Sequence, residues 1–170
     1  MGVADKNPKI PRPFNTDIES GLRSLFLLDA ITPLKGDLQR LIYYDYLLVH
    51  SGDVENGPTS LHTSLPYRSG EWLVRRRLIQ NGLDLMFSKE LVVKEFDRNA
   101  GILYSASPLT NSFLKHLATN YANDLRARAQ WIHERFSTIS DSELSDLMLK
   151  HLGEWGAEFS FSDFEEYEPN

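Results

Sequence analysis

The chain has 170 residues and a mass of 19.5 kDa, enough for one domain with its own core but too short for separate catalytic and regulatory domains. Apolar residues make up 41% and charged residues 25%, which excludes a disordered or collagen-like chain, and zero cysteines exclude disulfides and thiolate chemistry. The N-terminus has no apolar signal segment, and no apolar run approaches the roughly 18 residues that cross a bilayer. We therefore expect a cytoplasmic protein with no membrane partner.

The formal charge of −6 is concentrated at one end of the chain. Residues 154–170 hold six acids and no base, so residues 1–153 carry 18 charges of each sign. A domain whose main role is to bind nucleic acid usually has a net basic field. The neutral body therefore argues against DNA binding as the principal function.

The first predicted helix follows a polar arm. Residues 1–13 contain three prolines and too few apolar side chains to fold alone, so we interpret them as an extended arm. Thr16 and Glu19 have the spacing of a capping box, and Thr32-Pro33 stops the periodicity, which predicts a helix between them. The apolar face of this helix is expected to hold Ile18, Leu22, Leu25 and Phe26.

A long loop separates the second and third predicted helices. The second helix is predicted from Asp37, whose side chain can cap it, to Ser51-Gly52. Residues 51–69 are rich in Gly, Pro, Ser and Asn, and a loop of this length usually has a function. The third helix is predicted over residues 69–88. At about 100° per residue it is apolar on two nearly opposite sides, which indicates packing on both sides.

The second half of the chain combines a hairpin with further helices. Two β-prone runs flank a Gly-containing turn at residues 97–101, which predicts a β-hairpin. Helices are predicted from about residue 110 and from the capping box of Ser140 and Glu143 to Gly153. A helical seam between them is expected at Ala118, Ala122, Leu125, Ala129, Ile132 and Phe136.

The order of elements predicts an α+β, mainly α, fold. Three helices followed by a β-hairpin are the layout of a winged helix-turn-helix, with the hairpin as its wing. Four segments follow from this interpretation: an N-terminal arm at 1–13, a winged-helix-like domain at 14–108, a helical extension at 109–153 and an acidic, aromatic tail at 154–170.

Two interpretations are open for the polar groups of the long loop. His50, Asp53 and His62 could form a metal site of two histidines and one carboxylate, but their spacing matches no metal motif. The other interpretation, which we favour, is that these groups hold an ordered loop against the body, with Arg68 and Glu71 as an ion pair. The five residues are then structural or interface positions.

The basic cluster Arg75-Arg76-Arg77 lies on the third predicted helix. Three consecutive helical residues spread over about 200°, so the three side chains cannot all face one DNA groove. An ion-pair role, within the chain or with a partner, is favoured, and Arg75 and Arg77 are the candidate partner-binding residues.

No catalytic motif is present. The sequence has no Gly-x-Ser-x-Gly elbow, no phosphate-binding Gly-x-x-x-x-Gly-Lys-Ser/Thr loop and no Gly-x-Gly-x-x-Gly. We expect a protein that is not an enzyme and holds no metal or cofactor.

The C-terminal tail interleaves aromatic and acidic side chains. Aromatic residues are costly to leave in water, yet the acids between them oppose burial in an ordinary core. Such a segment suits a partner groove edged with Lys or Arg; alternatively Trp155 and Phe159 fold back onto the chain's own helices. The candidate partner-binding residues of the tail are Phe159, Phe161, Phe164 and Tyr167.

Several short stretches together resemble the middle component of bacterial ABC-three-component systems. The likeness runs from about Phe14 to Phe159, and the stretches that carry it are Leu48-Val49-His50-Ser51-Gly52-Asp53, Gly57-Pro58, Ser60-Leu61-His62, Arg68-Ser69-Gly70-Glu71, Val74-Arg75-Arg76, Gly82-Leu83 and Trp155-Gly156-Ala157-Glu158-Phe159. The resemblance, with Lamassu as the best-known group, implies a subunit without catalytic residues. It implies two partners, an SMC-like ABC ATPase and an effector, often a nuclease, in defence against phage and plasmids.

Three functional hypotheses follow. The first is a non-catalytic bridging subunit of such a defence complex, with DNA contacted through the assembled complex. The second is a winged-helix DNA-binding regulator that acts through Arg75, Arg77 and the hairpin residues Lys94 and Arg98. The third and least favoured is a metalloenzyme centred on the long loop, with His62 as a ligand.

Overall fold

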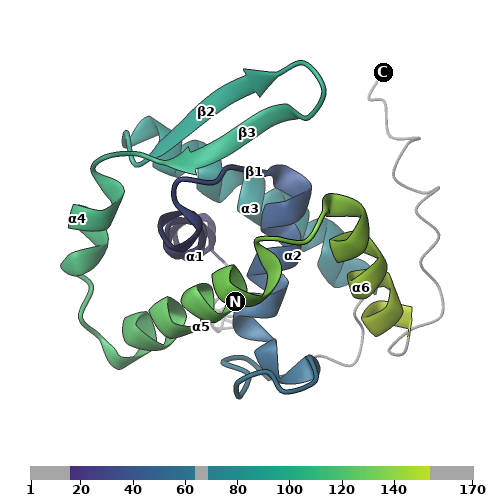
Figure 1. The fold of residues 1–170 in the computed structure, drawn as a ribbon. Coiled ribbons are helices and arrows are strands. Elements are labelled where there is room, and N and C mark those ends of the chain that lie inside the picture. The colour runs from purple at the N-terminus through teal and green to yellow at the C-terminus, as the bar shows by residue number, and fades with distance from the viewer. Residues whose placement is uncertain (1–15, 64–68, 154–170) are drawn as a thin grey trace, which may run out of the picture.

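A computed structural model describes residues 16–63 and 69–153 of the chain (Figure 1). Side chains are described from Leu73 onward in the third long helix and up to Lys150 in the last one. The elements are α1 (Asp17–Ile31), β1 (Gly36–Asp37), α2 (Leu38–Val49), the 3₁₀ turn η1 (Ser51–Asp53), α3 (Ser69–Ser88), β2 (Val92–Asp97), β3 (Gly101–Ala106), α4 (Thr110–Lys115), α5 (Asn120–Phe136) and α6 (Asp141–Gly153). The architecture is mainly helical with one small sheet, which confirms the α+β, mainly α, class.

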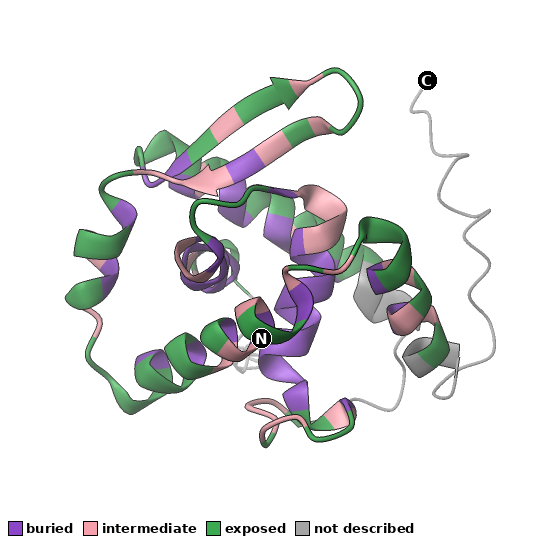
Figure 2. Ribbon diagram, in the orientation of Figure 1, coloured by how far each residue is buried: buried purple, intermediate pink, exposed green. Residues whose placement is uncertain are grey.

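Helix α2 is the centre of the molecule. Every residue from Leu41 to Val49 is buried, because α1, α3, α5 and α6 all pack against this one helix (Figure 2). Its three tyrosines are buried, and each hydroxyl reaches a polar partner: Tyr43 reaches Ser145, Tyr44 reaches Phe136 O and Tyr46 reaches Asp53. A helix that is buried on all sides therefore still satisfies its polar groups.

The predicted helix starts are confirmed by their caps. Glu19 N donates to Thr16 Oγ1 while Glu19 returns its carboxylate to Thr16 N, and Asp37 caps α2 at 2.7 Å from Arg40 N. Ser140 and Glu143 repeat the reciprocal box at α6. The prediction for Ile18 was wrong: it is 59% exposed, because the buried positions of α1 begin only at Ser20.

The hairpin of β2 and β3 is confirmed, and the sheet has a third strand that the sequence analysis missed. Strand β1 pairs antiparallel with β3 through Gly36↔Tyr104, so the strand order is β1-β3-β2. The hairpin turn needs Gly101, whose φ of 76° lies in the left-handed region. Up to the hairpin, the order of helices and strands is helix, strand, helix, helix, hairpin.

The helices of the predicted extension share the core of the body. Helix α5 lies across α1 and α2, and α6 packs on α2 (Figure 1). The predicted seam is buried from Ala122 to Phe136. Ala118 is exposed instead, because α4 ends at Lys115 and Thr119 caps a new helix. No helix among residues 16–63 and 69–153 is both long and apolar enough to span a bilayer.

Helices α1 and α3 cross at two glycines. A Cβ atom placed on Gly82 would lie 2.5 Å from Gly21 N and 2.9 Å from Asp17 O, both backbone atoms of α1. Real Cβ atoms do not approach so closely, so the two backbones touch only because neither residue carries a side chain. This crossing fixes the position of α3 against the core.

Candidate functional site at the three-helix crossing and on the surface of α3

A buried carboxylate joins the three long helices of the body. Asp45 on α2 is fully buried, and its Oδ1 accepts from Arg23 Nε of α1 at 2.6 Å. Its Oδ2 accepts from Arg75 Nη1 of α3 at 2.5 Å. Both arginines are themselves buried, so one acid holds two guanidinium groups that come from two different helices.

The charges of this cluster stabilise one another. Burial alone would raise the pKa of Asp45, but Arg23 and Arg75 outweigh burial and hold that pKa below its ordinary value. Burial likewise lowers and Asp45 raises the pKa of Arg23, with a net rise. Asp45 and Arg23 therefore stay ionised, and removal of the Asp45 carboxylate leaves uncompensated charge in the core.

A polar chain extends from the cluster to the long loop. Arg23 hydrogen-bonds the hydroxyl of Tyr121, which lies 2.9 Å from His62 Nε2. A guanidinium can only donate, so the tyrosyl oxygen accepts from Arg23. Tyr46 of α2 donates to Asp53 Oδ2 at 2.7 Å and packs against His50, with the two rings tilted and their centroids 4.9 Å apart.

His62 is kept neutral by its surroundings. Burial is the main cause that lowers its pKa to about 4, and the nearby charge of Arg23 adds to the effect. A neutral imidazole bonds the Tyr121 hydroxyl through Nε2, as donor or as acceptor according to its tautomer. The ring is therefore an uncharged hydrogen-bond partner of Tyr121 at neutral pH.

Hydrogen bonds attach the long loop to the body of the protein. Leu61 N and His62 N both donate to Val49 O, at 2.9 and 3.0 Å. Arginines of α5 reach the loop from outside, with Arg128 on Thr59 O and Arg135 on Glu55 O, each at 2.8 Å.

The structure places the five predicted loop residues as follows. His50 and His62 meet edge to face with ring centroids 6.3 Å apart, and Asp53 is bound by Tyr46. Arg68 lies outside the described residues, as does the side chain of Glu71. No group of three or more His, Asp or Glu residues that could hold a metal occurs within the described part of the chain. The three described residues hold the loop in place.

The arginine cluster splits between the interior and the surface. Arg75 is buried in its bond to Asp45, so its prediction as a surface partner-binding residue is corrected: the intramolecular ion pair takes it. Arg76 and Arg77 are exposed, and Arg76 makes one contact of 3.4 Å with Gln39. Arg77 remains a candidate partner-binding residue.

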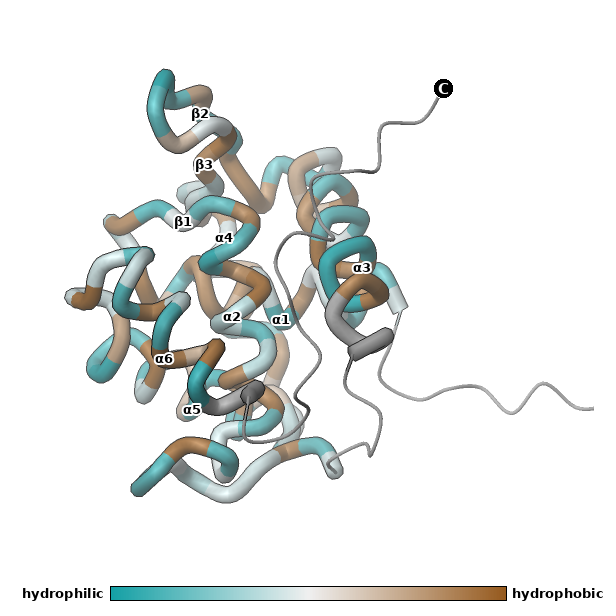
Figure 3. Tube along the Cα trace, turned by 90° about the vertical axis from the view of Figure 1, so that its right-hand side faces the viewer, coloured by the Kyte–Doolittle hydropathy of each residue, from teal (hydrophilic) through white to brown (hydrophobic). Residues whose placement is uncertain are grey.

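The outer side of α3 and the hairpin are unusually apolar for a surface. Hydrophobic and hydrophilic segments alternate along both (Figure 3). Six of the ten large hydrophobic side chains that are exposed among the described residues lie here, led by Phe96 at 77% and Leu73 at 60%. The other four of these six are Val74, Phe87, Val93 and Ile102. Such a concentration indicates an interaction surface.

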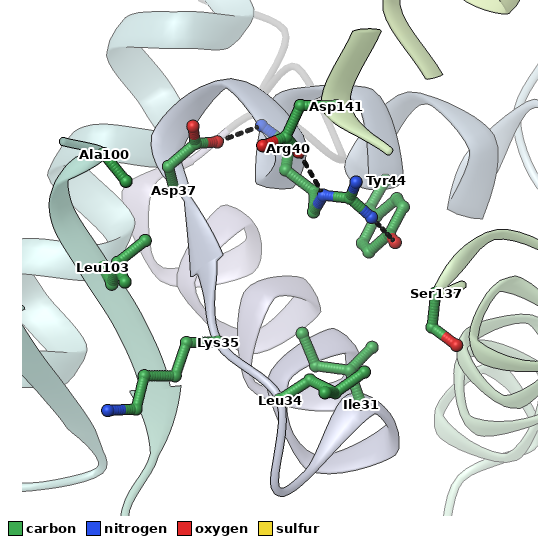
Figure 4. A pocket seen from close by; sticks show the side chains of 10 residues that line it. All are labelled: Ile31, Leu34, Lys35, Asp37, Arg40, Tyr44, Ala100, Leu103, Ser137 and Asp141. Atoms are coloured by element: carbon green, nitrogen blue, oxygen red, sulfur yellow. Dashed lines mark hydrogen bonds and ion pairs between the residues drawn. The ribbon is translucent and has the colours of Figure 1, made fainter. Parts of the chain in front are cut away.

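A cavity of about 240 Å³ lies where the hairpin turn, the start of α2 and the α5–α6 connection meet (Figure 4). Arg40 crosses it and donates to Asp141 Oδ1 and Tyr44 OH, each at 2.7 Å, and to Ile139 O at 2.8 Å. The guanidinium therefore ties α6 to α2. Because these bonds engage each nitrogen of the guanidinium, the cavity is a structural joint.

The centre of the buried cluster was not predicted from the sequence. Asp45 stands at helical spacing among the apolar residues of α2, and Arg23 stands beside Leu22 in α1. A lone charge on an apolar face is the signal that could have pointed to a buried pair. The tail residues Phe159, Phe161, Phe164 and Tyr167 lie outside the described residues.

The fold and the site define a small, mainly helical protein. Its buried polar groups join the helices, and exposed apolar side chains lie on α3 and the hairpin. The chain belongs to the family of Middle Component 2 of ABC-three component (ABC-3C) systems, whose family model matches residues 13–158. The match confirms the resemblance to a middle component and covers every described element up to the end of α6. No curated protein and no solved structure matched the chain.

Proposed function

We propose that this protein is the non-catalytic bridging subunit of a three-component defence complex. Its partners are an SMC-like ABC ATPase and an effector nuclease, as in the Lamassu systems that act against phage and plasmids. Membership in the middle-component family supports a role beside other components. The bridge acts mechanically in the cytoplasm and keeps the effector inactive until the complex senses foreign DNA.

The body of the subunit is, in this proposal, a winged helix. The order helix, strand, helix, helix, hairpin and the strand order β1-β3-β2 support it, since a short strand between the first two helices completes the sheet of the wing. Helix α3 then takes the position of the recognition helix, with the hairpin beside it.

The observation that carries the proposal is the character of this surface. Leu73, Phe87 and Phe96 are exposed on it, and charges of both signs lie between them. Protein interfaces combine aromatic residues and Arg in this way, whereas a DNA-reading surface is dominated by basic and polar groups. We place the ATPase on the surface of α3 and the hairpin.

The winged-helix DNA regulator is the second candidate, favoured by topology alone. Fewer basic residues are available to contact DNA than the sequence predicted, because Arg75 is buried and Lys94 is bound to Asp84 at 2.5 Å. It requires duplex binding that weakens steeply with salt and with Arg77→Ala. Binding no stronger than non-specific affinity at low salt would exclude it.

Co-expression of the three components tests the bridge directly. We expect the ATPase and the effector to co-purify when this chain is present and to separate when its gene is omitted. The catalytic activity of each partner should be measurable without this chain. A stable ATPase–effector complex that forms without it would overturn the proposal.

A further inference from the structure

The outer surface of α3 is one continuous face of the helix. At 100° per residue, Leu73, Arg77, Gln80, Asp84 and Phe87 fall within about 80° of one another. All five are exposed. The face runs the described length of α3 and is opposite to the one that carries Arg75 and Gly82 into the core.

The hairpin extends this face at its C-terminal end. Lys94 of β2 binds Asp84 and lies 4.7 Å over the ring of Phe87, so this side of the strand borders α3. Successive residues of a strand alternate, so Phe96 points to the same side as Lys94. Ile102 is directly opposite Phe96 in the register and completes an exposed apolar pair.

The charges on the surface favour an acidic ligand. Arg76, Arg77 and Arg98 are exposed, and none of them forms an ion pair with another described residue. Two acids of α3 and the hairpin, Asp84 and Glu95, are already bound by lysines. Apolar anchors edged by unneutralised arginines fit a segment that alternates aromatic and acidic residues.

The chain itself contains such a segment. Residues 154–170 carry six acids, no base and the aromatics Trp155, Phe159, Phe161, Phe164 and Tyr167. They follow α6, which like α3 packs on α2, and fully extended they span about 55 Å, whereas the 20 residues of α3 span about 30 Å. We propose that residues 154–170 dock intramolecularly on the surface of α3 and the hairpin. The free subunit thereby covers the surface on which we place its partner, and the partner must displace the segment.

A spin label tests this docking on the full chain. The protein has no cysteine, so Ser162→Cys gives a unique attachment site for a nitroxide. We expect strong broadening of the amide signals of Leu73, Arg77 and Phe96, and little broadening at Lys115 on α4. The broadening should decrease at least threefold in 0.5 M salt and in Arg76→Glu/Arg77→Glu.

The matched control is Lys115→Glu/Lys150→Glu, which changes the net charge equally at exposed sites elsewhere and should leave the broadening unchanged. Uniform weak broadening, or broadening centred on another surface, overturns the proposal. Broadening that appears only between a labelled and an unlabelled copy shows exchange between two chains and overturns the intramolecular contact. The experiment needs no partner, so its failure is separate from failure of the bridging role.

Discussion

The two faces of α3 differ in what their arginines do. Arg75 points inward to Asp45 and is buried with it, whereas Arg77, two residues later and about 200° around the helix, is exposed among apolar side chains. The inner face is complete: its charge is paired, and its glycine fits against α1. The outer face holds exposed apolar groups and Arg77, which forms no ion pair with another described residue. A single helix thus separates the part that determines the fold from the part available for binding.

The largest effect is expected at the centre of the inner face. Asp45→Asn leaves two buried guanidinium groups without their counter-charge, and we expect a loss of about 3–5 kcal/mol in the free energy of unfolding. Urea denaturation followed by circular dichroism measures it. Asp146→Asn, at an exposed position of α6, is the control and should change stability by less than about 0.5 kcal/mol. A loss below about 1 kcal/mol for Asp45→Asn would contradict the account of the cluster.

The helix crossing should show the next largest effect. Gly82→Ala improves intrinsic helix propensity by about 1 kcal/mol, but the new Cβ meets the backbone of α1. We expect the clash with α1 to outweigh the gain in helix propensity, so that the free energy of unfolding falls by about 1–3 kcal/mol. Gln80→Ala, on the exposed face of the same helix, should be neutral or slightly stabilising. Equal effects for both variants in thermal unfolding would show that the crossing can relax.

The contact between His62 of the long loop and Tyr121 of α5 should make the stability of the fold depend on pH. Below about pH 6.5 the unfolded chain protonates His62, whereas the native chain does so only near pH 4, so the unfolded state binds more protons between these values. Stability should therefore fall as the pH drops from 6.5 to 4, by about 2 kcal/mol after allowance for partial exposure of the ring.

His62→Gln should make the denaturation midpoint independent of pH in that window, since an amide can still hydrogen-bond Tyr121 but does not titrate. His116→Gln, an exposed histidine after α4, serves as the control and should keep the pH dependence of the parent chain. A parent chain whose midpoint is constant from pH 6.5 to 4 would show that His62 titrates normally.

The smallest effect on stability is expected on the outer face. Phe96→Ser and Arg77→Ala remove exposed side chains, so the free energy of unfolding should stay within about 0.5 kcal/mol of the parent value. Differential scanning calorimetry checks this expectation. A large loss for either variant would mean that the outer face is also part of the core.

Local signals in the sequence predicted most of the elements. The Thr16–Glu19 and Ser140–Glu143 boxes start their helices where expected, because capping depends on residues three positions apart. Strand β1 has only two residues and forms solely because β3 lies beside it, so no periodicity could indicate it. The prediction of a family resemblance was confirmed by the family match.

The buried cluster depends on contacts that are remote in sequence. Asp45 lies 22 residues from Arg23 and 30 from Arg75, and only the packed arrangement of three helices brings them together. The spacing of Arg75 and Arg77 showed that they face different ways, but not which one faces inward. That choice follows from the position of Asp45 on α2.

The central claim is that the outer face of α3 binds a partner while the inner face maintains the fold. The most direct test compares Arg76→Glu/Arg77→Glu/Phe96→Ser with Lys115→Glu/Lys150→Glu in co-purification with the ATPase that we propose as its partner. We predict at least a tenfold loss of bound ATPase for the first variant at an unchanged melting temperature, and full binding for the second. Undiminished ATPase binding by a folded first variant would contradict the account.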